Sequence, residues 1–172
     1  MEAATKVMVT GHRSLPAEAW NWVASDIARC LSKLADQRGD LIAIQGLALG
    51  ADMLFAEIAL GQDRPVWSFE PFSGQASRWN PTEQARHERI KAASARTVTL
   101  ADDPGGDRGL AVRLLHARND RMLGEADIVM AVLDARQTGG SRSAVLKALK
   151  RELPVLRLNP AARTTGWIKE LR

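Results

Sequence analysis

Short runs of apolar residues alternate along this chain with longer segments in which apolar residues recur every three or four positions. The first pattern is typical of buried strands and the second of amphipathic helices. The apolar runs predict strands at residues 6–10, 41–44, 65–70, 97–100, 127–133 and 154–158. The periodic segments predict helices at residues 16–36, 51–60, 82–95 and 110–124, and another that opens at 138–141 and ends near 152. We expect a further short helix around Trp167.

This alternation predicts βαβ units, and therefore an α/β fold with a mostly parallel sheet of about six strands covered by helices on both faces. A length of 172 residues suits one domain with a full core. No internal repeat, low-complexity segment or linker divides the sequence. We therefore predict a single domain over residues 1–172.

The segment LIAIQGLALGADMLFAEIAL, residues 41–60, organises the rest of the chain. It predicts a buried strand, a tight turn bracketed by Gly46 and Gly50, and an almost wholly apolar helix. Glycines let the backbone turn sharply, and the free N–H groups at the start of the helix attract anions. The order strand, turn and helix therefore predicts a site for phosphate.

The segments that follow several other strands also contain glycine and polar residues. Ligands of parallel sheets bind outside the carboxyl ends of the strands. We therefore expect four segments to meet at one edge of the sheet: residues 11–13, 46–50, 71–79 and 138–141. This convergence is the main functional prediction from the sequence.

The helix after Gly50 carries only two charged residues, Asp52 and Glu57. Asp52 either caps this helix or binds a ligand hydroxyl. No Lys or Arg of the same helix can pair with Glu57, which either belongs to a solvated face or acts as a ligand-binding or catalytic carboxylate. Glu57 is therefore the candidate catalytic residue.

Several further side chains have a structural and a functional interpretation. Arg13 is either a surface arginine or a bidentate partner of a phosphate. Arg118 and Asn119 lie on the core-facing side of their predicted helix, so they form either a structural network or a contact with Glu57 or a phosphate.

The remaining candidates lie in the turns. Phe72, Gln75 and Trp79 could stack on and hydrogen-bond a nucleobase, or could pack their loop onto the body of the protein. Gly139, Gly140 and Ser141 expose backbone N–H groups at a helix start, which suits phosphate.

Composition and charge narrow the function classes. The net charge of +4 and the scattered arginines favour small anionic ligands over nucleic acid, which we consider an unlikely partner. The single cysteine, Cys30, is expected to be a buried thiol in a reducing cytoplasm, and one Cys with three His cannot supply a zinc site. Neither a signal peptide nor a membrane span is predicted. The five tryptophans suggest a homodimer.

Several common motifs are absent from the sequence. It contains no G-x-G-x-x-G, no GxxxxGK[ST] and no GxSxG. A standard dehydrogenase, a P-loop enzyme and a nucleophile-elbow hydrolase are therefore not expected.

The order VTGHR, IQGLALGADMLFAE, EPFSGQASRW, ARNDRMLGEADIVMAVLD and GGS resembles the SLOG superfamily, and within it the YpsA-like proteins. The resemblance covers residues 5–158 and implies a Rossmann-like three-layer α/β/α fold that binds nucleotides or nucleotide-derived ligands such as AMP, ADP-ribose or NAD. It maps the site onto a set of matching positions: Gly11, Gly46, Gly50, Asp52, Glu57, Arg118, Asn119, Gly139 and Gly140.

Two branches of this superfamily suggest alternatives. LOG enzymes are phosphoribohydrolases with the motif PGGxGTxxE, but residues 138–146 lack its leading proline, third glycine and glutamate. LOG-like hydrolysis would therefore need Glu57 to supply the carboxylate. The DNA-processing protein A family binds single-stranded DNA, a role that a chain without a basic run does not strongly favour. A nucleotide-binding protein is the leading prediction.

Overall fold

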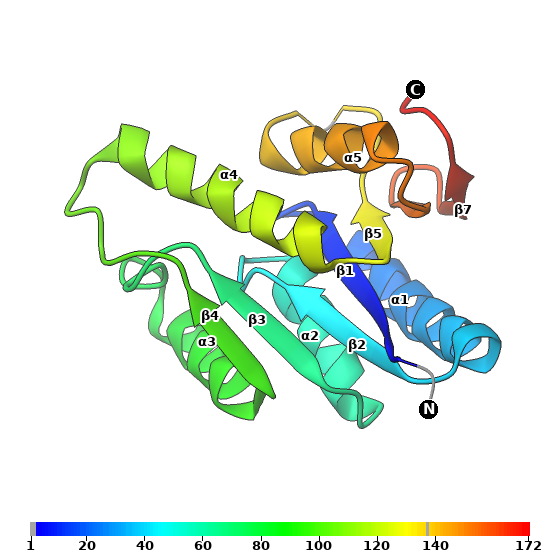
Figure 1. Cartoon of the computed structure of the whole chain (residues 1–172), viewed down its shortest axis with the longest axis horizontal. Helices are drawn as coiled ribbons and strands as arrows, with labels where there is room; N and C mark the ends of the chain where they lie inside the picture. Colours follow the sequence, from blue (N-terminus) through cyan, green and yellow to red (C-terminus); the bar gives the residue numbers. More distant parts are fainter. Residues whose placement is uncertain (1–2, 137) are drawn as a thin grey trace.

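The computed structural model describes residues 3–136 and 138–172 as a seven-stranded sheet with helices on both faces (Figure 1). The strands are β1 (Thr5–Gly11), β2 (Leu41–Gln45), β3 (Val66–Glu70), β4 (Arg96–Thr99), β5 (Ile128–Val132), β6 (Val155–Asn159) and β7 (Thr164–Ile168). The helices are α1 (Ala17–Arg38), α2 (Ala51–Gly61), α3 (Pro81–Ala93), α4 (Arg108–Glu125) and α5 (Gly140–Lys150). The predicted α/β class and Rossmann-like architecture are confirmed.

The strand order is β4-β3-β2-β1-β5-β6-β7, and every neighbouring pair is parallel except β6 and β7. The chain builds outward from β1 to β4, and α4 then carries it back so that β5 pairs with the other side of β1. The direction of building therefore reverses between β1 and β5. This reversal is the position at which open α/β sheets leave a crevice for ligands.

The predicted helix around Trp167 is wrong, because this segment forms β7, antiparallel to β6. The segment is rich in β-branched and aromatic residues, which favour a strand. Trp167 lies opposite Leu156 in the register, so the free edge of β6 supplied the pairing that decided its conformation.

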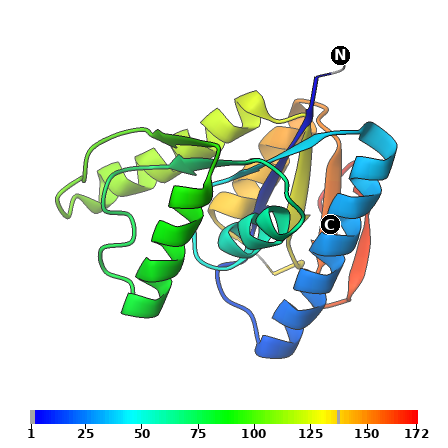
Figure 2. The ribbon, with the colours of Figure 1, turned by 90° about the horizontal axis from the view of Figure 1, so that it is seen from below.

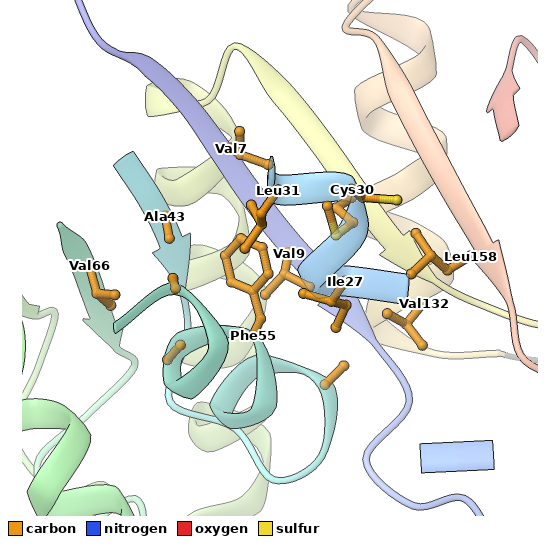
Figure 3. Close-up of a cluster of buried hydrophobic side chains, with 14 of the residues drawn as sticks. Val7, Val9, Ile27, Cys30, Leu31, Ala43, Phe55, Val66, Val132 and Leu158 are labelled. Carbon is orange, nitrogen blue, oxygen red and sulfur yellow. The ribbon is translucent and has the colours of Figure 1, made fainter. Parts of the chain in front are cut away.

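Two hydrophobic clusters pack the helices onto the sheet. Helices α1, α2 and α3 cover one face and α4 and α5 the other, as two perpendicular views show (Figures 1 and 2). Successive residues of a strand point to opposite faces. Val7 and Val9 of β1 therefore pack beneath α1 and α2 (Figure 3), and Met8 packs beneath α4 and α5. Phe55 of α2 is fully buried in the first cluster. This packing fixes the helix that follows the glycine turn.

Candidate functional site

The turn at residues 46–50 and the start of α5 meet at the carboxyl end of β1. The backbone N–H of Ala51 donates to the carbonyl of His12 at 3.0 Å. From the other side, the hydroxyl of Ser141 donates to the carbonyl of Gly11 at 2.9 Å. The expected convergence of these two turns is therefore confirmed.

Gly46 is held from two sides by charged side chains of two different helices. Its N–H donates to the carboxylate of Asp52 at 2.8 Å, and its carbonyl accepts from the guanidinium of Arg118. A Cβ at this position would lie 2.6 Å from Cζ of Arg118, so only glycine leaves room for the guanidinium. Asp52 and Arg118 thus brace the turn through its backbone.

Gly50 is required for a different reason. Its φ of 82° lies in the left-handed region, and a Cβ there would approach Cα of Arg13 to 2.7 Å. The turn also holds Leu47 at a φ of 56°, which a non-glycine residue adopts at a cost. The turn is therefore a close-fitting backbone loop that lies against the segment after β1.

The carboxylate of Asp52 and the guanidinium of Arg118 are both almost fully buried, at 7% and 3% exposure. Burial raises the pKa of the Asp52 carboxyl, and the charge of Arg118 and the N–H of Gly46 oppose that shift. Burial likewise lowers the pKa of the Arg118 guanidinium, against the attraction of Asp52. Each charge therefore stabilises the other in a region that water does not reach.

The cap interpretation of Asp52 is wrong, because Gly50 is the N-cap residue of α2 and makes no side-chain cap hydrogen bond. The structure instead places the Asp52 carboxylate beneath the turn, where it accepts the N–H of Gly46. The sequence could not distinguish these two roles, because both place an acid in the first turn of the helix.

The same network reaches the start of α5. The guanidinium of Arg118 donates from Nε to the side-chain oxygen of Asn119 at 2.9 Å. A Cβ at Gly140 would lie 3.6 Å from Nδ2 of Asn119. Gly139, with a φ of 81°, is the N-cap of α5. The structure therefore brings Arg118, Asn119 and both glycines together.

An open cavity of about 520 Å³ lies above the glycine turn. Arg13, Leu49 and Gly50 line it, together with Trp20 of α1 and the first turns of α3. Within residues 3–136 and 138–172, no acid lies within ion-pair distance of Arg13, and the N–H groups of Leu49 and Gly50 have no hydrogen-bond acceptor. This cavity therefore combines an available cation with free backbone donors.

Glu57 has a basic partner, although its own helix supplies none. Arg86 of α3 forms an ion pair with the Glu57 carboxylate, and its Nε donates to Oε1 at 2.6 Å. Arg86 also lies 3.5 Å from Glu83. The sequence excluded partners only within the same helix, whereas the partner comes from the neighbouring one. Glu57 is not among the described residues that line the cavity.

A second cavity, of about 440 Å³, lies between the loops that follow β3 and β4. Phe72, Gln75 and Trp79 line one side, and the charged residues of the lining are Arg78, Arg108, Asp103 and Asp107. The side-chain amide of Gln75 also donates to the carbonyl of Gly46 at 3.4 Å. The loop at 71–79 therefore contacts the glycine turn, as the sequence predicted.

His12 and Asp134 are polar residues of this edge that the sequence analysis did not select. Nε2 of His12 accepts the backbone N–H of Asp134 at 3.1 Å, and both side chains line a cavity of about 370 Å³ between the loops after β1 and β5. Their positions directly after two adjacent strands could have identified them.

Their environments shift both pKa values. Burial lowers the pKa of His12, against the attraction of Asp134. Burial alone would raise the pKa of Asp134, but the backbone N–H and the guanidinium of Arg136, together with the attraction of His12 when it is protonated, lower it overall. Nε2 of His12 can accept the N–H of Asp134 only when it carries no proton, and the lowered pKa of His12 favours that form.

Two further features concern the described residues as a whole. They contain no group of three or more His, Cys, Asp or Glu side chains arranged to hold a metal ion. Among residues 3–136 and 138–172, no helix combines the length and apolar character needed to cross a bilayer.

No family model and no curated protein sequence matches the chain. Its fold is similar to that of DNA processing protein A from Streptococcus pneumoniae, with a TM-score of 0.63 and 19% identity over 91% of this chain and 50% of that protein. DNA processing protein A from Helicobacter pylori, described for its single-stranded DNA binding mode, has a TM-score of 0.61 and 23% identity. The match covers 90% of this chain and 65% of that protein. The Moco carrier protein from Chlamydomonas reinhardtii has a TM-score of 0.52 and 19% identity, and the match covers 93% of this chain and 80% of that protein.

These similarities, all below 25% sequence identity, establish the Rossmann-like fold. The chain spans only half to two thirds of the two DNA processing proteins.

Proposed function

We propose that the protein binds a phosphorylated nucleotide or nucleotide-derived ligand at the carboxyl edge of its sheet, as a YpsA-like member of the SLOG superfamily. The phosphate would contact the N–H groups of Leu49 and Gly50 and the guanidinium of Arg13. Gly139, Gly140 and Ser141 would supply further donors at the start of α5. Phe72 and Trp79 would face the base.

The available donors at the glycine turn carry this proposal. Asp52 and Arg118 hold the turn from below, and Arg13 lies above it beside a cavity of about 520 Å³. Backbone N–H groups at a helix start and an unpaired arginine together favour an anion. The buried contacts of Asp52 and Arg118 with Gly46 hold the donors in position before the ligand binds, so little conformational entropy is lost on binding.

Calorimetric titration with AMP, ADP-ribose and NAD tests the proposal. Arg13→Gln is expected to weaken binding about tenfold, the loss of one charge-assisted hydrogen bond. Arg89→Gln, which removes an exposed arginine of α3 that does not line the cavity, is the matched control. The absence of binding of all three ligands at millimolar concentration would contradict the proposal.

Single-stranded nucleic acid is a second candidate, because three separate cavities line the same edge. Aromatic side chains occur in two of them, Trp20 in one and Phe72 and Trp79 in another, and arginines occur in all three. Stacking platforms beside arginines suit an extended strand of nucleotides. The fold similarity to DNA processing protein A is consistent with this candidate.

Salt dependence separates the two candidates. An oligothymidylate that contacts several arginines should lose affinity steeply with salt, with a log–log slope of about −0.7 per phosphate contact. Arg78→Gln and Arg108→Gln should each reduce this slope, because each removes an arginine that could contact a phosphate. An oligonucleotide affinity that does not depend on salt would exclude the second candidate.

A further inference from the structure

Strand β7 forms one edge of the sheet, and no described strand pairs with its outer side (Figure 1). Trp167, the fourth of its five residues, is 53% exposed. A cavity of about 180 Å³ lies between β7 and α1, and another of about 420 Å³ lies between β7 and the end of α5. Trp167 lines both cavities. The free edge is therefore flanked by a hollow on each face of the sheet.

Side chains of β7 alternate between these two faces. The hydroxyl of Thr165 donates to Asp26 of α1, whereas Ile168 packs against the cluster beneath α4 and α5. A strand added along the outer edge would alternate in the same way. Its side chains would enter the two cavities in turn, the pattern by which edge strands recognise extended peptides.

The charges around this edge favour an acidic occupant. Arg163 and Lys169 flank β7, and Lys33 of α1 lines the smaller cavity. In the described part of the chain, none of these three cations has an acid within ion-pair distance. Glu152 is the acidic residue among the described residues that line the larger cavity.

The same charges disfavour a second copy of this chain. If two β7 strands paired antiparallel about Gly166, Arg163 of one copy would lie opposite Lys169 of the other. Like charges directly opposite one another destabilise a strand pair, and basic residues at sheet edges commonly prevent self-pairing.

We propose that the outer edge of β7 binds an extended acidic segment of another protein, which adds to the sheet as an antiparallel strand. Two carboxylates six positions apart lie opposite Arg163 and Lys169. Apolar residues between these carboxylates contact Trp167 and enter the flanking cavities.

Fluorescence anisotropy with the labelled peptide DTVLVTD tests this proposal, with VTDDLVT as a control of identical composition and charge. We expect DTVLVTD to bind at least about tenfold more tightly than the control. The double variant Arg163→Glu/Lys169→Glu should weaken binding of DTVLVTD about tenfold and should instead bind KTVLVTK. Amide hydrogen exchange of residues 164–168 should slow when the peptide binds.

Three results would overturn the proposal: no binding of DTVLVTD at millimolar concentration, equal affinities for the two acidic peptides, or a wild-type dimer that Trp167→Ser dissociates. Circular dichroism of each variant confirms that it is folded, so that a loss of binding is assigned to the edge itself.

Discussion

Helix α2 carries two carboxylates in opposite environments. Asp52 is 7% exposed and lies beneath the glycine turn. It accepts the N–H of Gly46, and Arg118, which carries the opposite charge, donates to the carbonyl of the same residue. The side chain of Glu57 is 41% exposed and pairs with Arg86 on the surface. Both acids have an arginine nearby, so their surroundings, and not the presence of a partner, distinguish their roles.

This difference in burial determines how much each acid and its arginine contribute to the free energy of unfolding. Removing one partner from a buried network leaves an uncompensated charge and is strongly destabilising. An exposed ion pair is screened by water and contributes roughly 0–1 kcal/mol. We therefore expect Asp52 and Arg118 to determine the stability of the site, and Glu57 and Arg86 to affect it little.

Replacing Arg118 should have the largest effect. Arg118→Leu leaves the Asp52 carboxylate buried without its counter-charge and removes a donor to the carbonyl of Gly46. We expect the free energy of unfolding to fall by about 3–5 kcal/mol, measured by urea denaturation at pH 7. Arg89→Leu, on the exposed side of α3, controls for loss of an arginine and should change it by less than about 0.5 kcal/mol. If Arg118→Leu lowers the free energy of unfolding by less than about 1 kcal/mol, the buried network contributes no more than the exposed pair, and the comparison fails.

Asp52→Asn should have the next largest effect, about 1–3 kcal/mol, because the amide keeps an acceptor for the N–H of Gly46 but loses the charge. Combined with Arg118→Leu, it should cost clearly less than the sum of the two single losses, since each substitution already disrupts the same network. Additive losses would show that the two residues act independently.

The sequence predicted the sheet and the site edge better than the roles of individual side chains. Strands such as β5 are short apolar runs bounded by turn residues, so their pattern identifies them directly. The chain order of strands and helices then places Gly11, Gly46 and Gly139 at one edge, because every βα turn of a parallel sheet lies at the carboxyl ends of the strands.

Contacts between distant segments could not be predicted in the same way. Arg86 reaches Glu57 from another helix, and Arg118 reaches Gly46 from the opposite face of the sheet. The tail formed β7 because the edge of β6 was open to it, a condition that only the assembled sheet creates. Such partners depend on helix packing, which no local pattern encodes.

His12 and Asp134 provide an intermediate case, with side-chain exposures of 12% and 6% at a distance of 3.6 Å. Burial lowers the pKa of His12 below the ordinary 6.5, so the unfolded chain binds more protons than the folded protein just below that pH. Stability should therefore fall as the pH drops from 7 through 6.5, with a slope of at most about 1.4 kcal/mol per pH unit.

His12→Gln should flatten this slope, because the glutamine oxygen can still accept the N–H of Asp134 but does not titrate. Thermal unfolding at several pH values between about 7 and 5 measures the effect, and His116→Gln serves as the control. The pKa of Asp134 is lowered overall, so its own contribution is lost only below the ordinary carboxyl value of 3.8, outside this range. A slope unchanged by His12→Gln would show that His12 is not the group responsible.

Glu57→Gln should have the smallest effect. It breaks only the exposed pair with Arg86, so we expect a loss of less than about 1 kcal/mol in the free energy of unfolding. Nucleotide affinity should be unchanged, because Glu57 does not line the cavity above the glycine turn. Arg86→Gln removes the other member of the pair and should lower the free energy of unfolding by a similarly small amount.

Glu57→Gln also tests the nucleotide-cleaving alternative, in which the wild-type protein releases free base from a nucleoside monophosphate. If Glu57→Gln slows that release a hundredfold or more, Glu57 is the catalytic carboxylate, and its exposure reflects access to substrate.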